Sequence, residues 1–250
     1  MCGRYALIEL PEAVRSVLGY IEQPNFPPRY NIAPTQPVPV VVRADNGGRR
    51  FTLMRWGFLP SWVKDPNDFP LVFNIRSESA AEKPSFRNAL KRRRCLMPAD
   101  GFYEWRKAGK NAQPYLIRRA DRRVFAFAAL WETFSAADGS EIATAAILTT
   151  AAPTPFDAIH PRSPAVRRDG DVAGWLDPET SEAEARACIA PPQSDLFEAI
   201  AIGPAINKVA NDDASVQTPL DDAAAPEPPP ARAPRAKPSR PDDDGQGSLF

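Results

Sequence analysis

Short segments rich in β-branched and aromatic residues recur along most of this chain, separated by prolines, glycines and charged turns. Segments of this length and composition are typical of strands. The strand candidates are residues 38–42, 51–56, 115–118, 124–131 and 142–150. Three stretches with helical start signals or periodicity predict helices at 11–18, 85–93 and 179–189. Many strands with a few interspersed helices predict an α+β fold: a compact single domain around a largely antiparallel, barrel-like sheet with flanking helices.

The segment after residue 222 has a composition that does not support a packed core. From Pro226 it is rich in proline and contains almost no apolar residue until Leu249 and Phe250. Such a segment cannot bury enough surface to offset the entropy of ordering its chain. We therefore expect a folded domain over 1–222 and a disordered, proline-rich tail over 223–250.

The charge and the cysteine content limit the class of protein. Lys+Arg and Asp+Glu number 31 each, so a protein of this composition that binds nucleic acid must gather its basic residues into a patch. The cysteines, Cys2, Cys95 and Cys188, are too widely spaced for a disulfide framework, and a single histidine leaves no zinc-ligand spacing. We expect a reduced, cytoplasmic protein with no metal and no organic cofactor. No apolar run has transmembrane length, and we identify no signal peptide.

The chain begins Met1-Cys2-Gly3-Arg4, and the small second residue allows Met1 to be removed. Cys2 would then have a free α-amine beside its thiol. An aldehyde can condense with the amine to a Schiff base, and the thiol can close a thiazolidine, which no internal cysteine can do. An α-amine has a pKa of roughly 7.7–8.0, so part of it is unprotonated near neutral pH. The dipeptide alone is equally compatible with an unreactive cysteine.

Four further segments add to this start of the chain. Residues 55–62 read RWGFLPSW, 73–79 read FNIRSES, 94–105 read RCLMPADGFYEW, and 159–164 read IHPRSP with the only histidine. In this order, and together with the opening MCGR, they resemble the SRAP (SOS-response-associated peptidase) family over roughly residues 1–220. Any one of these motifs alone is weak, but the combination is highly specific.

The resemblance implies a compact α+β domain around a curved sheet, with a basic groove for single-stranded DNA. It implies covalent capture of abasic sites as a DNA–protein crosslink, which protects the lesion during replication and repair. Cys2 would form the crosslink, Asn74 would position the ring-opened sugar, and Glu104 would handle protons during Schiff-base formation. His160 would assist sugar ring opening, a proton transfer that suits histidine near neutral pH.

The resemblance also implies contacts with DNA. Arg76 and Arg162, with Arg4, would contact phosphates near the lesion, because guanidinium groups match phosphate oxygens. Trp62 and Trp105 would stack on bases or form walls of the site. The chain departs from the family's motifs at Ser163 and Pro153, which stand where methionine and asparagine are usual. Neither change removes a proposed catalytic group, but both affect the loop of His160.

Several of these residues also have ordinary structural interpretations. Glu104 could be a solvated loop carboxylate, and Trp56 is better explained as a core residue. The basic run 91–94 is typical of a solvated helix face. Cys95 and Cys188 are expected to serve in packing.

Three other functions stay open at this point. Glutamine amidotransferases also use a terminal cysteine, as an acyl nucleophile, but this chain lacks convincing glutamine-binding segments and a synthase domain. The family's historical label suggests a peptidase that uses Cys2, either on other peptides or only on its own Met1, and a lyase activity is also compatible. A DNA-binding module that shields abasic sites without covalent chemistry would keep its binding after Cys2→Ala.

The chain ends with Gln246-Gly247-Ser248-Leu249-Phe250. This peptide resembles those by which bacterial proteins dock on the replicative sliding clamp: Gln246 would make hydrogen bonds beside a pocket filled by Leu249 and Phe250. A pattern with three informative positions also arises by chance. On this motif we expect a bacterial protein. We also expect a monomer that associates with the nucleoid when bound to DNA.

Overall fold

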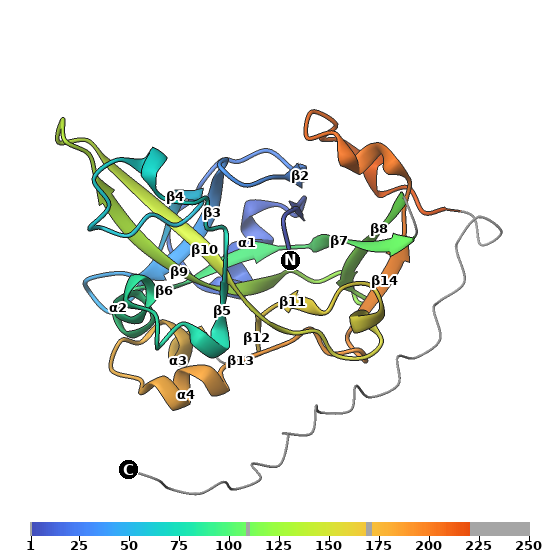
Figure 1. The fold of residues 1–250 in the computed structure, drawn as a ribbon. Coiled ribbons are helices and arrows are strands. Elements are labelled where there is room, and N and C mark those ends of the chain that lie inside the picture. The colour runs from blue at the N-terminus through green and yellow to red at the C-terminus, as the bar shows by residue number, and fades with distance from the viewer. Residues whose placement is uncertain (1, 109–110, 169–171, 221–250) are drawn as a thin grey trace, which may run out of the picture.

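The computed structural model describes residues 2–108, 111–168 and 172–220, and its strands form two sheets (Figure 1). Five strands of the larger sheet are β3 (Pro37–Arg43), β4 (Arg49–Trp56), β6 (Arg94–Ala99), β9 (Phe125–Ser135) and β10 (Glu141–Ala151). They close as a barrel in the order β10-β4-β3-β6-β9, because β9 pairs again with β10. β4 and β10 are parallel, and the other neighbouring pairs are antiparallel. Closure leaves these strands without the free edges that an open sheet presents.

Apolar side chains fill the barrel. Trp56, Leu96 and Phe127 are completely buried, which confirms the interpretation of Trp56 as a core residue. The ring of Tyr5 meets Trp56 edge-on at 5.3 Å and Phe127 at 5.6 Å, so the first strand of the chain packs directly on the barrel core. The barrel therefore serves as the rigid support for the start of the chain.

The second sheet is open. Its strands are β1 (Tyr5–Leu7), β2 (Arg29–Ile32), β7 (Gly101–Ala108), β8 (Asn111–Arg119) and β14 (Phe197–Ala201), in the antiparallel order β14-β8-β7-β1-β2. Only Asp100 separates β6 from β7, so one length of chain passes from the barrel into the open sheet. The Asp100 carboxylate accepts hydrogen bonds from the N–H groups of Ile8 and Glu9, which fixes the end of β1 at this crossing. Burial raises the pKa of Asp100 to about 6.

Short strands extend the barrel on two sides. β5 (Asn74–Arg76) and β11 (Arg162–Pro164) pair with β10, in parallel and antiparallel fashion respectively. β12 (Val166–Arg167) pairs with β9 and with β13 (Ile189–Ala190). Asn74 and His160 therefore come from segments attached to the same barrel strand, although they lie far apart in sequence.

Four helices and several short 3-10 turns complete the described part of the chain. The helices are α1 (Pro11–Leu18), α2 (Pro84–Arg92), α3 (Val172–Leu176) and α4 (Glu182–Ala187). The 3-10 turns are Pro66–Asp68, Ser77–Ser79, Phe156–Ala158, Pro204–Asn207 and Ala214–Gln217. Pro11 starts α1, and Gly19 ends it in the left-handed region at φ 68°, where glycine is favoured. Ser181 and Glu184 form a capping box at the start of α4.

The structure confirms the predicted α+β class and the barrel-like, largely antiparallel sheet. The helix predicted at 179–189 is shorter at both ends, since its capping residue is Ser181 and Ile189 belongs to β13. The basic run 91–94 is not uniformly solvated, because Arg94 is only 4% exposed. Its guanidinium donates to the carbonyl oxygens of Trp175 at 2.6 Å and Leu90 at 2.9 Å, so the solvated-face interpretation is wrong for Arg94.

The tail predicted for 223–250, with Gln246, Leu249 and Phe250, lies outside the described residues. The boundary at 222 and the clamp-binding peptide therefore stay predictions. Within the described ranges, no helix combines the length and the apolar character needed to cross a membrane.

Candidate functional site

Cys2 lies three residues before the first residue of β1, Tyr5, and β1 is an interior strand that is held on both sides by β7 and β2. The N–H of Tyr103 donates to the carbonyl of Arg4 at 3.0 Å, which extends the backbone pairing of β1 with β7 toward Cys2. The Cys2 side chain is completely buried, and its Sγ lies 3.7 Å from the same carbonyl. Burial, reinforced by the negative charge of Glu104, raises the pKa of the thiol well above its ordinary range. The thiol is therefore protonated at neutral pH in this environment.

Glu104 lies in the middle of β7, where it pairs with Tyr115 of β8. Its side chain is only 3% exposed, so the interpretation as a solvated loop carboxylate is wrong. Burial raises the pKa of Glu104 to about 7, and the positive charge of the amino terminus opposes this shift. A carboxyl group with this pKa can give and take a proton near neutral pH, which is what a general acid or base requires.

Asn74 begins β5 and joins this strand to the start of the chain. Its Nδ2 donates a hydrogen bond of 2.7 Å to the carbonyl oxygen of Cys2. Its Oδ1 is buried and accepts no hydrogen bond from any described residue. A buried acceptor without a partner is costly, so Asn74 has one atom that orders Cys2 and another that is available to a ligand.

His160 follows the 3-10 turn Phe156–Ala158 and precedes β11. Its Nδ1 lies 3.0 Å from the backbone nitrogen and 2.9 Å from the backbone oxygen of Arg162. Burial lowers the pKa of His160, so the imidazole is neutral at pH 7. The positive charge of the amino terminus acts on all three groups as a lesser cause: it opposes the rise in pKa at Cys2 and Glu104 and adds to the fall in pKa at His160.

The three predicted phosphate-binding arginines have different surroundings. Arg76 is exposed at the end of β5. Arg4 is partly buried and donates to the Asn31 side chain at 2.7 Å and to the Ile206 carbonyl at 2.8 Å. Arg162 makes an ion pair with Glu78. Glu78 belongs to the motif at 73–79, but no role was predicted for it from the sequence. Glu78 and Arg162 are 84 residues apart, so no local signal in one sequence announces their pairing.

The two predicted base-stacking tryptophans also differ. Trp62 is 62% exposed and packs perpendicular to Phe69, with 5.7 Å between the two ring centroids. Trp105 is partly buried on β7, and its Nε1 donates to the Asn207 side chain at 2.8 Å. Trp62 therefore offers a free aromatic face, whereas Trp105, next to Glu104 in sequence, is suited to form a wall.

The loop positions that depart from the family's pattern keep their backbone contacts. Ser163 is 3% exposed and pairs with Thr150 across β10 and β11. The carbonyl of Pro153 accepts a hydrogen bond of 3.1 Å from the Asp157 N–H, which closes the turn before His160. Both residues are thus incorporated in the loop that supports His160.

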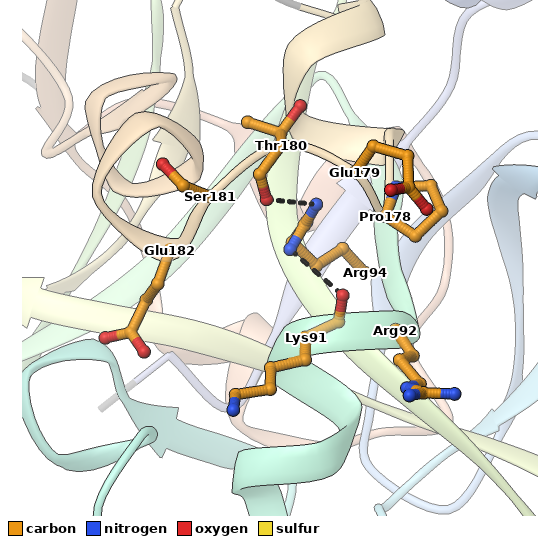
Figure 2. A pocket seen from close by; sticks show the side chains of 8 residues that line it. All are labelled: Lys91, Arg92, Arg94, Pro178, Glu179, Thr180, Ser181 and Glu182. Carbon is orange, nitrogen blue, oxygen red and sulfur yellow. Dashed lines mark hydrogen bonds between the residues drawn. The ribbon is translucent and has the colours of Figure 1, made fainter.

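A cavity of about 620 Å³ lies away from these residues, between α2 and the start of α4 (Figure 2). The Arg94 guanidinium lies between Lys91 and Thr180, and it donates hydrogen bonds to their carbonyl oxygens at 3.3 Å and 3.4 Å (Figure 2). The cavity lies where the end of α2 approaches the start of α4, and none of the predicted site residues lines it. In the described part of the chain, no group of three or more His, Cys, Asp or Glu side chains could hold a metal ion.

Comparison with known proteins gives consistent matches. The family model described as SOS response associated peptidase (SRAP) matches residues 1–209. The abasic site processing protein YoqW of Bacillus subtilis (strain 168) is 32% identical over 216 residues, which cover 84% of this chain and 96% of YoqW. The abasic site processing protein HMCES of Gallus gallus is 30% identical over 266 residues, which cover 88% of this chain and 78% of that protein. A crystal structure of a Bacteroides thetaiotaomicron protein matches with a TM-score of 0.80 at 24% identity, over 88% of this chain and 100% of that one, and so has the same fold.

Proposed function

The chain belongs to the SOS response associated peptidase (SRAP) family, and on this premise we propose that it processes abasic sites in single-stranded DNA through covalent capture by Cys2. Relatives with about the same length are named abasic site processing proteins. The observation that supports the covalent chemistry most directly is the buried grouping of Cys2, its hydrogen-bond partner Asn74, and Glu104 with a pKa of about 7. The proposal requires removal of Met1, so that Cys2 has a free α-amine.

The chemistry begins at the amine because the buried thiol holds its proton. The α-amine attacks the C1′ aldehyde of the ring-opened sugar, and the resulting carbinolamine loses one water to give the imine. Protonated Glu104 donates the proton that lets hydroxide leave as water. The Cys2 thiol then adds to the imine carbon, its proton passes to the nitrogen, and a thiazolidine closes. The sum of the reaction is aldehyde, amine and thiol giving thiazolidine and one water.

Asn74 and His160 act before the imine forms. The abasic sugar is mostly a closed hemiacetal, so its C1′ hydroxyl must lose a proton as the ring oxygen gains one. With Nδ1 of His160 occupied by the backbone of Arg162, this proton exchange falls to Nε2. The Oδ1 of Asn74 accepts a hydrogen bond from a sugar hydroxyl, which places C1′ next to the amine.

DNA binding uses residues around this buried centre. Exposed Arg76 contacts a phosphate near the lesion, and Arg4 and Arg162 contribute positive charge from their fixed positions. The open face of Trp62 stacks on an unpaired base, with Trp105 as a wall of the site. Docking of the C-terminal peptide on a sliding clamp, and a cytoplasmic, nucleoid-associated location, stay predictions.

The test is a denaturing gel of the purified protein with single-stranded DNA that has one abasic site. Mass spectrometry first establishes that Met1 is absent. We expect a shifted band that requires the lesion and is lost in Cys2→Ala, while both proteins bind intact single-stranded DNA equally. Binding without any adduct in the Met1-processed protein would favour the noncovalent shielding module, and cleavage of an unrelated peptide would favour the peptidase.

A further inference from the structure

An ion pair connects two segments on either side of β10. Glu78 lies in the 3-10 turn Ser77–Ser79, directly after β5, and Arg162 is the first residue of β11. The guanidinium binds the carboxylate in a bidentate manner, with Nη1 donating to Oε1 at 2.6 Å and Nη2 to Oε2 at 2.9 Å. The Glu78 side chain is 53% exposed, whereas that of Arg162 is 18% exposed. A bidentate pair of this kind defines the orientation of the guanidinium more closely than a single hydrogen bond does.

The Arg162 side chain has a further anchor within the barrel extension. Its Nη2 also donates to the carbonyl and, at 3.1 Å, to the hydroxyl of Thr149 on β10. The backbone of Arg162 pairs with Ala151 in the antiparallel β10–β11 register. The guanidinium is therefore held from two sides, by Glu78 at the surface and by Thr149 in the sheet.

The same residue holds the imidazole of His160. Both backbone atoms that contact Nδ1, the nitrogen at 3.0 Å and the oxygen at 2.9 Å, belong to Arg162. We propose that Glu78 is a positioning residue for His160, which it orients through its bidentate pair with Arg162. This inference deepens the proposed function and rests on it for its catalytic consequence.

The charges around His160 determine what loss of Glu78 would do. The positively charged groups that act on the imidazole are the amino terminus, Arg162 and Lys107. Glu78 compensates the charge of Arg162, and the hydrogen bond from Arg162 lowers the pKa of Glu78, so the carboxylate stays ionised at neutral pH. In Glu78→Gln the positive charge of Arg162 is uncompensated, which disfavours a second positive charge on the imidazole. The pKa of His160 should fall further, and its tautomer balance should shift as Arg162 moves.

The experiment uses the fact that the chain has one histidine. Nitrogen-15 NMR of the full-length protein reports the pKa and the tautomer of that imidazole without any assignment problem, and it needs no DNA. Single-turnover crosslinking to abasic single-stranded DNA is measured on the same samples. We expect Glu78→Gln to shift the His160 signals and to slow crosslinking about tenfold or more, although the loss of a negative charge beside Arg162 leaves intact single-stranded DNA bound at least as tightly. Glu78→Asp, which retains the charge, should recover part of both effects.

The matched control is Glu182→Gln. Glu182 pairs with Arg186 at 3.0 Å on α4, so this variant removes another glutamate–arginine pair from a partly exposed position. It should leave the His160 signals and the crosslinking rate as in the wild type. Thermal unfolding of each variant checks that the fold is intact.

The two proposals fail in different ways. Unchanged tautomer and pKa of His160 in Glu78→Gln would overturn the positioning role of Glu78, whatever happens to the rate. Tighter binding of intact DNA together with unchanged His160 signals would instead mean that Glu78 only restrains Arg162 from phosphate. Shifted signals with an unchanged crosslinking rate would uphold the positioning role and remove His160 from the proposed chemistry.

Discussion

The two sides of the candidate site differ in how they accommodate charge. On the side of the open sheet, Cys2 and Glu104 are buried, and burial raises both pKa values. On the side of the strands added to β10, Glu78 and Arg162 form an ion pair that reaches the solvent, and the pKa of Glu78 is lowered. Where water is excluded, burial thus keeps the Cys2 thiol protonated and lets Glu104 change protonation near neutral pH, whereas the groups that hold geometry remain fully charged.

Glu104→Gln tests the buried side most severely. The substitution keeps the size of the side chain and removes its titration, so we expect crosslinking to slow by about 10²–10⁴-fold. Because the pKa of Glu104 is about 7, a wild-type rate that depends on the protonated acid falls as pH rises through that value. Because the attacking α-amine must also be unprotonated, single-turnover rates between pH 5.5 and 8.5 should pass through a maximum in the wild type, whereas the variant should keep only the rise that comes from the amine. A variant with the wild-type rate and profile would mean that Glu104 takes no part in proton transfer.

The same carboxyl group should weaken the fold at high pH. Its pKa rises from 4.5 to about 7 on folding, so in this window the folded protein holds a proton that the unfolded chain releases. The free energy of unfolding therefore falls as pH rises through the window, by an amount on the order of 3 kcal/mol as an upper limit, and the loss is complete above pH 7. Urea unfolding of the wild type and Glu104→Gln at pH 5 and pH 8 measures the difference, which should grow with pH in favour of the variant. Asp100, with its own raised pKa, is present in both proteins and cancels.

Asn74→Ala tests the connection between the two sides. It removes the hydrogen bond from Nδ2 to the Cys2 carbonyl, which is one restraint on the start of the chain, and it also removes the Oδ1 acceptor proposed for the sugar. If this hydrogen bond lowers the activation free energy of crosslinking by about 1–1.5 kcal/mol, its loss slows the reaction about tenfold. The affinity for intact single-stranded DNA should not change. If crosslinking keeps its wild-type rate, the pairing of β1 alone is sufficient to hold Cys2.

Tyr5→Phe should have the smallest effect and the opposite sign. The Tyr5 hydroxyl is buried and makes no hydrogen bond with the described residues, although the ring packs well on Trp56 and Phe127. Removing it should raise the free energy of unfolding by about 1 kcal/mol, because a buried hydroxyl without a partner is costly. Crosslinking should be unaffected. A slower reaction in a more stable protein would instead assign this hydroxyl to the site, beside Cys2.

The sequence predicted the barrel better than the open sheet. Segments 38–42, 51–56, 124–131 and 142–150 correspond to β3, β4, β9 and β10, whose buried residues have the β-branched and aromatic character of strands. β6 was missed because Pro98 lies inside it, and β7 because it contains Glu104, Arg106 and Lys107. A charged residue in a strand looks like a surface position unless its neighbours in space are known.

The candidate site could be predicted only as a set of residue types. The resemblance gave Cys2, Asn74, Glu104 and His160, and the structure shows which atoms of Cys2 and Asn74 meet. The resemblance could not predict the raised pKa of Glu104, because that pKa depends on burial by segments distant in sequence. The capping box of Ser181 and Glu184 was a local signal that would have placed the start of α4 correctly. The pair of Glu78 and Arg162 has no local signal.

The interior position of β1 has a practical consequence for anyone who prepares this protein. The first strand is hydrogen-bonded along both of its edges, so Cys2 is buried at a fixed position in the folded molecule and is not part of a flexible end. A peptide fused ahead of Cys2 must be accommodated in that buried space, and in the proposed chemistry it would also convert the attacking amine into an unreactive amide. If Cys2 reacts as proposed, an amino-terminal affinity tag would block crosslinking unless it is removed so that Cys2 becomes the first residue.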